Sequence, residues 1–201
     1  TAASALARKY DGDNPLFIYL PETDFDQEAF LKDLEKAFET NCNLIVCVSE
    51  GIHDAEGTFI CEYDSSVGID TFGHKMLAGC GKYLENLVRS RLGVKARSVE
   101  LNVSQRCSAA MISATDQQEA VAAGKFGVQA ALNGETGKMV SFIREADADG
   151  NYQMVCGLED VNEICNQEKV VPAEWITPDG HDVTEDFVRY ARPLIQGNVN
   201  V

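Results

Sequence analysis

The stretch LFIYLPETDFDQEAFLKDLEKAFETNCNLIVCV, residues 16–48, decides the fold. It begins with a short apolar run over 16–20 and ends with a second one over 44–48, and both are typical of strands that a parallel sheet buries on its two faces. Between them, apolar residues recur at the spacing of one helical face over 26–40. Strand, helix and strand in this order predict a βαβ unit and an α/β fold with a mostly parallel sheet.

The remainder of the chain extends this pattern to a three-layer αβα lobe. Asp116 and Glu119 have the spacing of a capping box, which predicts a helix start there. Asp160 and Thr184 are expected to begin two further helices. The other elements expected after residue 48 are a surface excursion over 50–72, a helix over 73–92 closed by Gly93, a strand over 95–103, and a hairpin of strands 138–145 and 152–156.

Composition excludes several classes of partner. The formal net charge of −15 argues against non-specific attraction to nucleic acid or to an anionic bilayer, because both require a surplus of Lys and Arg. The sequence has no apolar run near the roughly 20 residues that span a bilayer. Its seven cysteines form no Cys-x-x-Cys pair, so neither a zinc site nor a disulfide framework is indicated, and we expect a cytoplasmic protein.

Two predicted strand ends carry chemically useful side chains. In an open parallel sheet the ligand crevice lies at the carboxyl ends of the strands. Strand 44–48 leads into Glu50, beside a glycine that would let a ligand approach the backbone. Strand 95–103 leads into Gln105 and Arg106, an amide and a guanidinium at the corresponding edge.

The charge distribution supports a phosphate-binding function near these residues. Residues 82–106 contain six basic and two acidic side chains, within a chain that is strongly acidic overall. Arginine forks suit phosphate oxygens because they donate two parallel hydrogen bonds. The six are Lys82, Arg89, Arg91, Lys95, Arg97 and Arg106. We therefore expect a small phosphorylated ligand.

Each of these side chains also has a purely structural interpretation. A glutamate at the position of Glu50 can cap a helix or form a surface ion pair. Arg97, placed inside the predicted strand, would by default be a solvated side chain. From the residues alone both alternatives stay open.

Five segments, in order along the chain, resemble the C-terminal half of the 6-phosphofructokinase family. The resemblance covers nearly the whole chain. The segments are FIYLPE (17–22), VSEG (48–51), ELNVSQRC (100–107), the pairs Thr115-Asp116 and Glu119-Ala120, and PAEWI (172–176).

The resemblance implies roles for the candidate residues. Glu50 would contact hydroxyl groups of fructose 6-phosphate, and Arg106 of the Gln105-Arg106 pair would bind its 6-phosphate. Arg97 matches a second phosphate-binding arginine, which in the family reaches in from a neighbouring subunit. Many members have His or Tyr where this chain has Val103, and Asn102 is a candidate substitute.

The same resemblance implies a reaction whose catalytic residues lie outside this chain. It points to phosphoryl transfer to the 1-hydroxyl of fructose 6-phosphate, and the Asn-x-x-Gln-Arg-Cys form favours pyrophosphate as donor. The family's general base, its donor-binding glycine-rich segment and the Mg²⁺ ligands are expected in an N-terminal half, so no catalytic or metal-binding residue is assigned here. The alternatives are an ATP-dependent 6-phosphofructokinase and a non-catalytic sugar-phosphate sensor domain.

The expected organisation follows from this assignment. The chain, 1–201, would be a fragment whose fructose 6-phosphate-binding lobe covers about 14–182. Helices at 1–9 and 184–195 would pack against the N-terminal half. The fragment alone is expected to be inactive, and the intact enzyme to be a homodimer or homotetramer.

Overall fold

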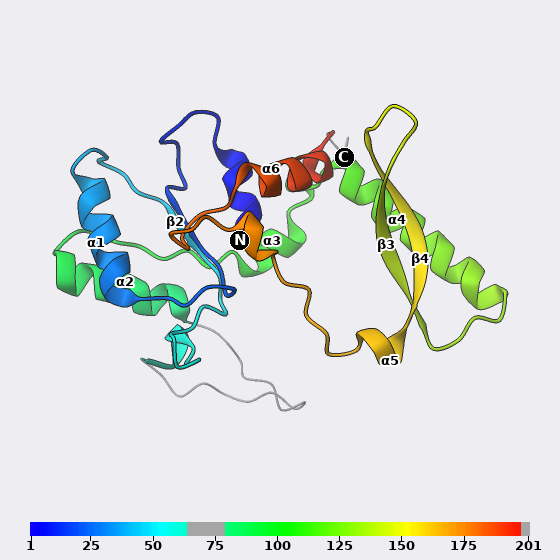
Figure 1. The fold of residues 1–201 in the computed structure, drawn as a ribbon, viewed down its shortest axis with the longest axis horizontal. Coiled ribbons are helices and arrows are strands. Elements are labelled where there is room, and N and C mark those ends of the chain that lie inside the picture. The colour runs from blue at the N-terminus through cyan, green and yellow to red at the C-terminus, as the bar shows by residue number, and fades with distance from the viewer. Residues whose placement is uncertain (64–78, 198–201) are drawn as a thin grey trace. The chain divides into compact units, whose positions relative to one another are not determined.

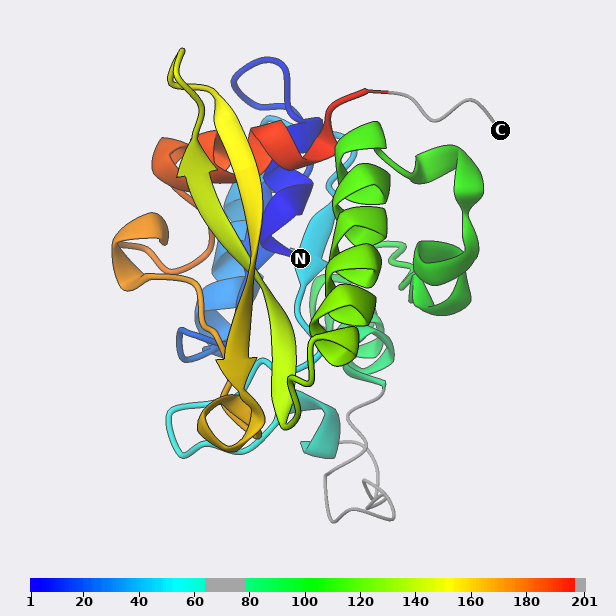
Figure 2. The same ribbon diagram turned by 90° about the vertical axis from the view of Figure 1, so that its right-hand side faces the viewer.

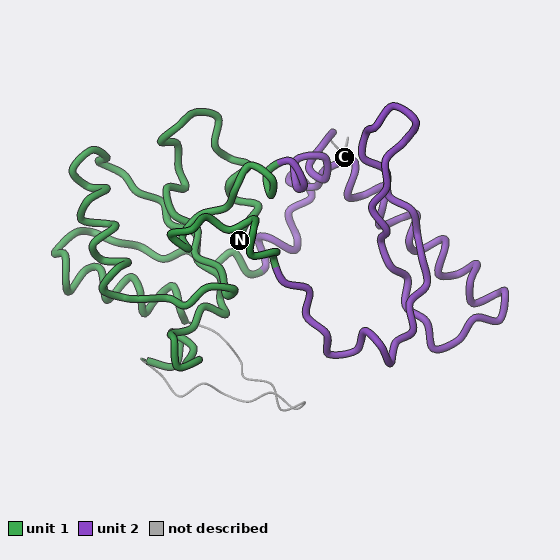
Figure 3. The backbone as a smooth tube through the Cα atoms, in the orientation of Figure 1, with its two compact units in different colours: residues 1–102, 171–188 green, residues 103–170, 189–201 purple. Residues whose placement is uncertain are grey.

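The computed structural model describes residues 1–63 and 79–197, which form two compact units. Figure 3 shows them in different colours. Unit 1 consists of residues 1–102 and 171–188, and unit 2 of residues 103–170 and 189–201. The chain therefore leaves unit 1 at 102 and re-enters it at 171.

Unit 1 contains the predicted βαβ arrangement (Figure 1). Strand β1, Phe17–Tyr19, pairs in parallel with β2, Val46–Val48, and the α-helix between them, α1, covers Gln27–Phe38. The register sets Tyr19 opposite Val48. A parallel pair needs a crossover connection, which α1 supplies, so the interpretation of the opening stretch is confirmed.

The two long helices of unit 1 begin and end for local reasons. Asp26 caps α1 by accepting a hydrogen bond from the Ala29 backbone N–H (2.8 Å). Helix α2, Cys80–Leu92, ends at Gly93, whose φ of +67° is in the left-handed region that glycine adopts at little cost. The part of this helix predicted over 73–78 lies outside the described residues.

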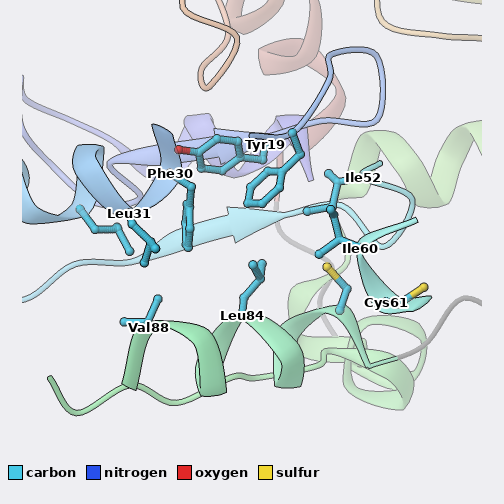
Figure 4. Packing of buried hydrophobic residues seen from close by; sticks show 11 residues of the cluster. Tyr19, Phe30, Leu31, Ile52, Ile60, Cys61, Leu84 and Val88 are labelled. Atoms are coloured by element: carbon cyan, nitrogen blue, oxygen red, sulfur yellow. The ribbon is translucent and has the colours of Figure 1, made fainter. Parts of the chain in front are cut away.

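The core of unit 1 lies between α1, α2 and the strand pair. Figure 4 shows Leu84 and Val88 of α2 pointing toward β2, with Phe30 and Leu31 of α1 close by. Three of these four side chains are less than 7% exposed, and Val88 is 7% exposed. The excursion after β2 adds a bridge between His53 and Phe59 and the 3₁₀ helix η2, Ile60–Tyr63. Its Ile60 is fully buried, so the excursion contributes to the core.

The strand predicted over 95–103 is wrong. In the structure the segment after Gly93 belongs to no strand, and helix α3, Asn102–Cys107, occupies its last part. Burial nevertheless alternates along this segment, because Val94 and Ala96 pack against the core while Arg97 is exposed. The described residues provide no neighbouring strand for it, and a side chain of α2 binds its backbone instead.

Unit 2 is built on helix α4 and a hairpin (Figure 2). Helix α4 covers Ala114–Leu132, strand β3 covers Lys138–Ala146, and β4, Tyr152–Asp160, pairs with it antiparallel. The predicted hairpin is confirmed, although β4 is four residues longer than expected. The helix start was misplaced, because the cap of α4 is Ser113, whose hydroxyl accepts from the Asp116 N–H (3.0 Å).

Short helices complete both units. Asp160 caps a helix as predicted, but this helix, α5, is a single turn. The Thr184 hydroxyl is buried without a hydrogen-bond partner among the described residues, so α6 lacks the expected side-chain cap. The elements are α5 (Val161–Ile164), α6 (Glu185–Ala191), and the 3₁₀ helices η1 (Ala2–Ala7), η3 (Ala109–Met111), η4 (Ala173–Trp175) and η5 (Arg192–Ile195).

The position of Leu84 gives a test of the core. Because its side chain is 6% exposed and faces the sheet, Leu84→Ala should lower the free energy of unfolding by about 2 to 5 kcal/mol. Val99, 81% exposed, is the matched control, and Val99→Ala should cost less than about 0.5 kcal/mol. Urea denaturation followed by circular dichroism measures both values, and equal losses would show that the described core is wrong.

Candidate functional site

Glu50 lies at the carboxyl edge of the parallel pair, as the sequence predicts. The Ser49 N–H donates to the Tyr19 carbonyl (2.9 Å), so the chain leaves β2 directly beside the end of β1. Glu50 is the next residue, and its side chain is exposed. Within the described part of the chain its carboxylate makes neither a hydrogen bond nor an ion pair, so it is neither a helix cap nor a surface ion-pair partner there.

Glu50 also lies within electrostatic reach of the first residue of α2. Burial raises the pKa of the Cys80 thiol to about 12, and the charges of Cys61, Glu50 and Glu100 add to this effect. Cys80 is therefore a protonated, buried thiol at neutral pH, without nucleophilic character. The edge beside it carries negative charge that can accept hydrogen bonds from ligand hydroxyls.

A hollow of unit 1 is lined by residues that follow β1 and by the segment 173–184. It has a volume of about 470 Å³. Glu22 lines it and accepts a hydrogen bond from the Val171 N–H (2.8 Å) through one oxygen, while its other oxygen is buried without a partner among the described residues. Thr23 and Thr184 add hydroxyl groups to the lining. Glu22 thus gives this hollow a carboxylate oxygen that is free to accept a hydrogen bond from a ligand.

Arg97 is held at the surface of unit 1 by the extended segment that follows α2. Its neighbours Ala96 and Ser98 are partly buried, and Arg97 between them is exposed. Ser98 is attached to α2 through Glu85, whose Oε2 accepts from the Ser98 N–H (3.0 Å) and from the Ser98 hydroxyl (2.8 Å). The Arg97 guanidinium makes no hydrogen bond or ion pair with the described residues.

Glu85 is the most strongly bonded carboxylate of this region. Its side chain is 9% exposed, and its Oε1 accepts from the Lys82 ammonium (2.8 Å) and the Arg89 guanidinium (3.3 Å). The Lys82 bond, followed by the two bonds from Ser98, lowers the pKa of Glu85 to about 2 from the ordinary 4.5. The carboxylate is therefore charged throughout the physiological pH range.

The other three predicted residues lie on α3. Asn102 is its first residue, has a φ of +36°, and donates from Nδ2 to Glu100 at the long distance of 3.4 Å. Gln105 and Arg106 follow on the same helix, not past a strand end as predicted, and all three side chains are exposed. Asn102 belongs to unit 1 with Glu50 and Arg97, whereas Gln105 and Arg106 belong to unit 2.

The described residues offer no fitting place for Mg²⁺. Among them, no group of three His, Cys, Asp or Glu side chains is close enough to hold a metal. In the Asp-rich turn of the hairpin, the Asp147 carboxylate is already engaged by backbone groups of the turn. Its Oδ1 accepts hydrogen bonds from the N–H groups of Asp149 (2.9 Å) and Asn151 (2.8 Å).

The sequence prediction missed Glu85 and Glu22 as site components. Glu85 entered it only as an acidic residue of the basic region, yet Lys82 and Arg89 stand three and four residues away, the spacing at which helical side chains pair. The sequence spacing therefore indicated these two ion pairs. It did not indicate the contact with Ser98, thirteen residues further along.

Comparison with known proteins gives these residues a context. No protein-family model matches the chain. It is 36% identical over 200 residues to the pyrophosphate--fructose 6-phosphate 1-phosphotransferase of Rhodospirillum rubrum, a match that covers 97% of this chain and 48% of that protein. The solved structure of a pyrophosphate-dependent phosphofructokinase from Marinobacter aquaeolei is 30% identical, with a TM-score of 0.77 over 98% of this chain and 45% of that one.

The chain belongs to the phosphofructokinase family. The α/β fold class predicted from the sequence is confirmed by the same structure. A shorter match, 36% identical over 125 residues, joins 62% of this chain to 35% of the ATP-dependent 6-phosphofructokinase 2 of Streptomyces coelicolor. The chain spans about half the length of the curated relatives it matches over nearly its whole extent. No described helix is long and apolar enough to cross a bilayer.

The pKa of Glu85 predicts a pH-dependent contribution to stability. A carboxyl whose folded pKa lies below 4.5 stabilises the fold above that pH and loses the contribution as the pH falls toward 2. Glu85→Gln should therefore destabilise the chain equally at pH 5 and pH 7, and progressively less below about pH 4.5. Glu39→Gln, at an exposed glutamate, corrects for the general effect of acid. Thermal unfolding across this range measures the difference, and a difference that grows on acidification would contradict the assignment.

Proposed function

We propose that the chain is the sugar-phosphate-binding half of a 6-phosphofructokinase that transfers a phosphoryl group from pyrophosphate to the 1-hydroxyl of fructose 6-phosphate. The observation that carries the proposal is the exposed Glu50 carboxylate at the carboxyl edge of the β1–β2 pair, where the family resemblance expects the sugar contact. Relatives named for this reaction match nearly the whole chain and support it.

In this proposal the chain acts by positioning. Glu50 accepts hydrogen bonds from sugar hydroxyls, and Arg97 and Arg106 bind the 6-phosphate through their guanidinium forks. Asn102 and Gln105 add amide donors on the same short helix. Phosphoryl transfer depends mainly on alignment and charge neutralisation, so a half that fixes the acceptor supplies a substantial part of catalysis.

The proposal assigns the remaining parts to the other half of the enzyme. As the family resemblance implies, the general base, the donor site and the Mg²⁺ ligands would lie in an N-terminal half. The lobe would cover about 14–182, with helices at 1–9 and 184–195 contacting that half. The isolated chain is expected to turn over nothing, and its seven free thiols suit a cytoplasmic enzyme.

The donor is assigned to pyrophosphate because four relatives matched over 97 to 98% of the chain are named for it. The relative named as ATP-dependent matches 62% of the chain. ATP is therefore the second candidate. Measuring turnover of the intact enzyme with each donor separates the two, and activity with ATP alone would reverse the assignment.

The role of Arg106 is tested in the intact enzyme. Losing a charge-assisted contact to a phosphate costs roughly 2 to 3 kcal/mol, so Arg106→Ala should raise the KM for fructose 6-phosphate about 30- to 150-fold. Lys125→Ala, which removes an exposed cation from α4 of the same unit, is the matched control and should leave KM unchanged. Steady-state kinetics measures both, and a KM within threefold of wild type for Arg106→Ala would refute the phosphate contact.

The proposed oligomer, a homodimer or homotetramer, shares Arg97 between subunits. An Arg97→Ala subunit and an Arg106→Ala subunit should each be nearly inactive, because every site then lacks one arginine. In a mixed two-fold dimer one site has both arginines and the other has neither, so random exchange should restore roughly a quarter of wild-type activity. Native mass spectrometry verifies the exchange. Hybrids without activity would show that Arg97 serves its own subunit or no site.

A further inference from the structure

Glu85 of α2 accepts hydrogen bonds from the extended segment that carries Arg97. The Ser98 N–H that it binds belongs to the peptide group joining Arg97 to Ser98, so this bond fixes the orientation of the backbone on the carboxyl side of Arg97. The Ser98 hydroxyl donates to the same Oε2. A single carboxylate oxygen thus holds both the backbone and the side chain next to the arginine.

We propose that Glu85 is a positioning residue for Arg97 and thereby for binding of the sugar phosphate. The inference rests on the proposed function, in which Arg97 contacts phosphate. Glu85 does not touch the substrate in this proposal. Among the described residues, no strand lies beside this segment. Glu85 supplies the hydrogen-bond acceptor that a neighbouring strand would supply in a sheet.

The environment of Glu85 suits this role. Lys82 and Arg89 hold its other oxygen from one turn on either side, so the orientation of the carboxylate does not depend on Ser98 alone. The side chain is 9% exposed, which protects the two Ser98 bonds from competition by water. Gly81 allows the close approach, because a Cβ at that position would lie 3.2 Å from the Ser98 Cβ.

The direction in which phosphate binding changes when Glu85 is removed separates a positioning role from a purely electrostatic one. Glu85 carries a negative charge close to a proposed anion site, so removing it should strengthen phosphate binding if charge alone mattered. If it orients Arg97, removing it should weaken binding. Glu85→Gln keeps one oxygen that can accept from the Ser98 N–H, so it should preserve much of the function that Glu85→Ala loses.

The experiment is a double-mutant cycle in the intact enzyme, with KM for fructose 6-phosphate and for pyrophosphate as readouts. Glu85→Ala should raise the fructose 6-phosphate KM about 5- to 50-fold and leave the pyrophosphate KM unchanged, whereas Glu85→Gln should raise it less than about threefold. In the Arg97→Ala background, Glu85→Ala should add less than about twofold. The control is Glu28→Ala, which removes the exposed ion pair between α1 and Arg91 of α2 and should have no effect on either KM.

Amide hydrogen exchange gives a readout that does not depend on the enzymatic role. The Ser98 amide should exchange more than about tenfold faster in Glu85→Ala than in Glu28→Ala, because only the first variant removes its acceptor. Unchanged exchange, a lowered KM, or full additivity with Arg97→Ala would each overturn the positioning role. If Arg106→Ala raises KM but Arg97→Ala does not, the positioning role falls while the proposed function stands. If neither variant raises KM, both the positioning role and the proposed function are refuted.

Discussion

The parallel pairing of β1 with β2 is the constraint on which unit 1 depends. Parallel strands of three residues each cannot be joined by a turn, so the chain must cross over through α1 before β2 can pair. The pairing also brings the two carboxyl ends to one edge, where the Ser49 N–H meets the Tyr19 carbonyl. Glu50, the next residue after Ser49, therefore lies beside the end of β1. The candidate sugar-binding carboxylate is thus a consequence of the strand pairing.

Sequence patterns predicted this part because each local signal agreed with the packing. The apolar runs around β1 and β2, the Asp26 cap and the apolar face of α1 all indicate the same elements. The segment after Gly93 also alternates, with Val94 and Ala96 partly buried, but alternation reports burial and not pairing. Whether such a segment becomes a strand depends on what its backbone bonds. Here the Glu85 carboxylate of α2 accepts the backbone hydrogen bond, and no local sequence pattern predicts this contact.

The candidate site, like the fold, was predictable only where local sequence signals agreed with the packing. Glu50 is the first charged side chain after β2, so its placement follows from the strand pairing. Arg106 was selected because it follows a predicted strand, and this geometry was wrong because α3 is a six-residue helix without a periodic signal. Glu85 was overlooked because its pairs with Lys82 and Arg89 look like ordinary surface ion pairs, which contribute little on average. Its importance lies in the contact with Ser98, which only the tertiary structure shows.

The Glu85 network also explains how an acidic chain can present cations to a phosphate. With a net charge of −15, the long-range field repels anions, so binding must come from short-range, geometrically fixed donors. Of the basic residues in 82–106, Lys82 and Arg89 are committed to Glu85, and Arg91 to Glu28. Arg97 and Arg106 are the arginines of this region without a bond to any described residue. The local excess of positive charge therefore does not form a general basic patch. Its ion pairs neutralise Lys82, Arg89 and Arg91. Among the described residues, the guanidinium groups of Arg97 and Arg106 keep the unpaired state that the proposed phosphate contacts require.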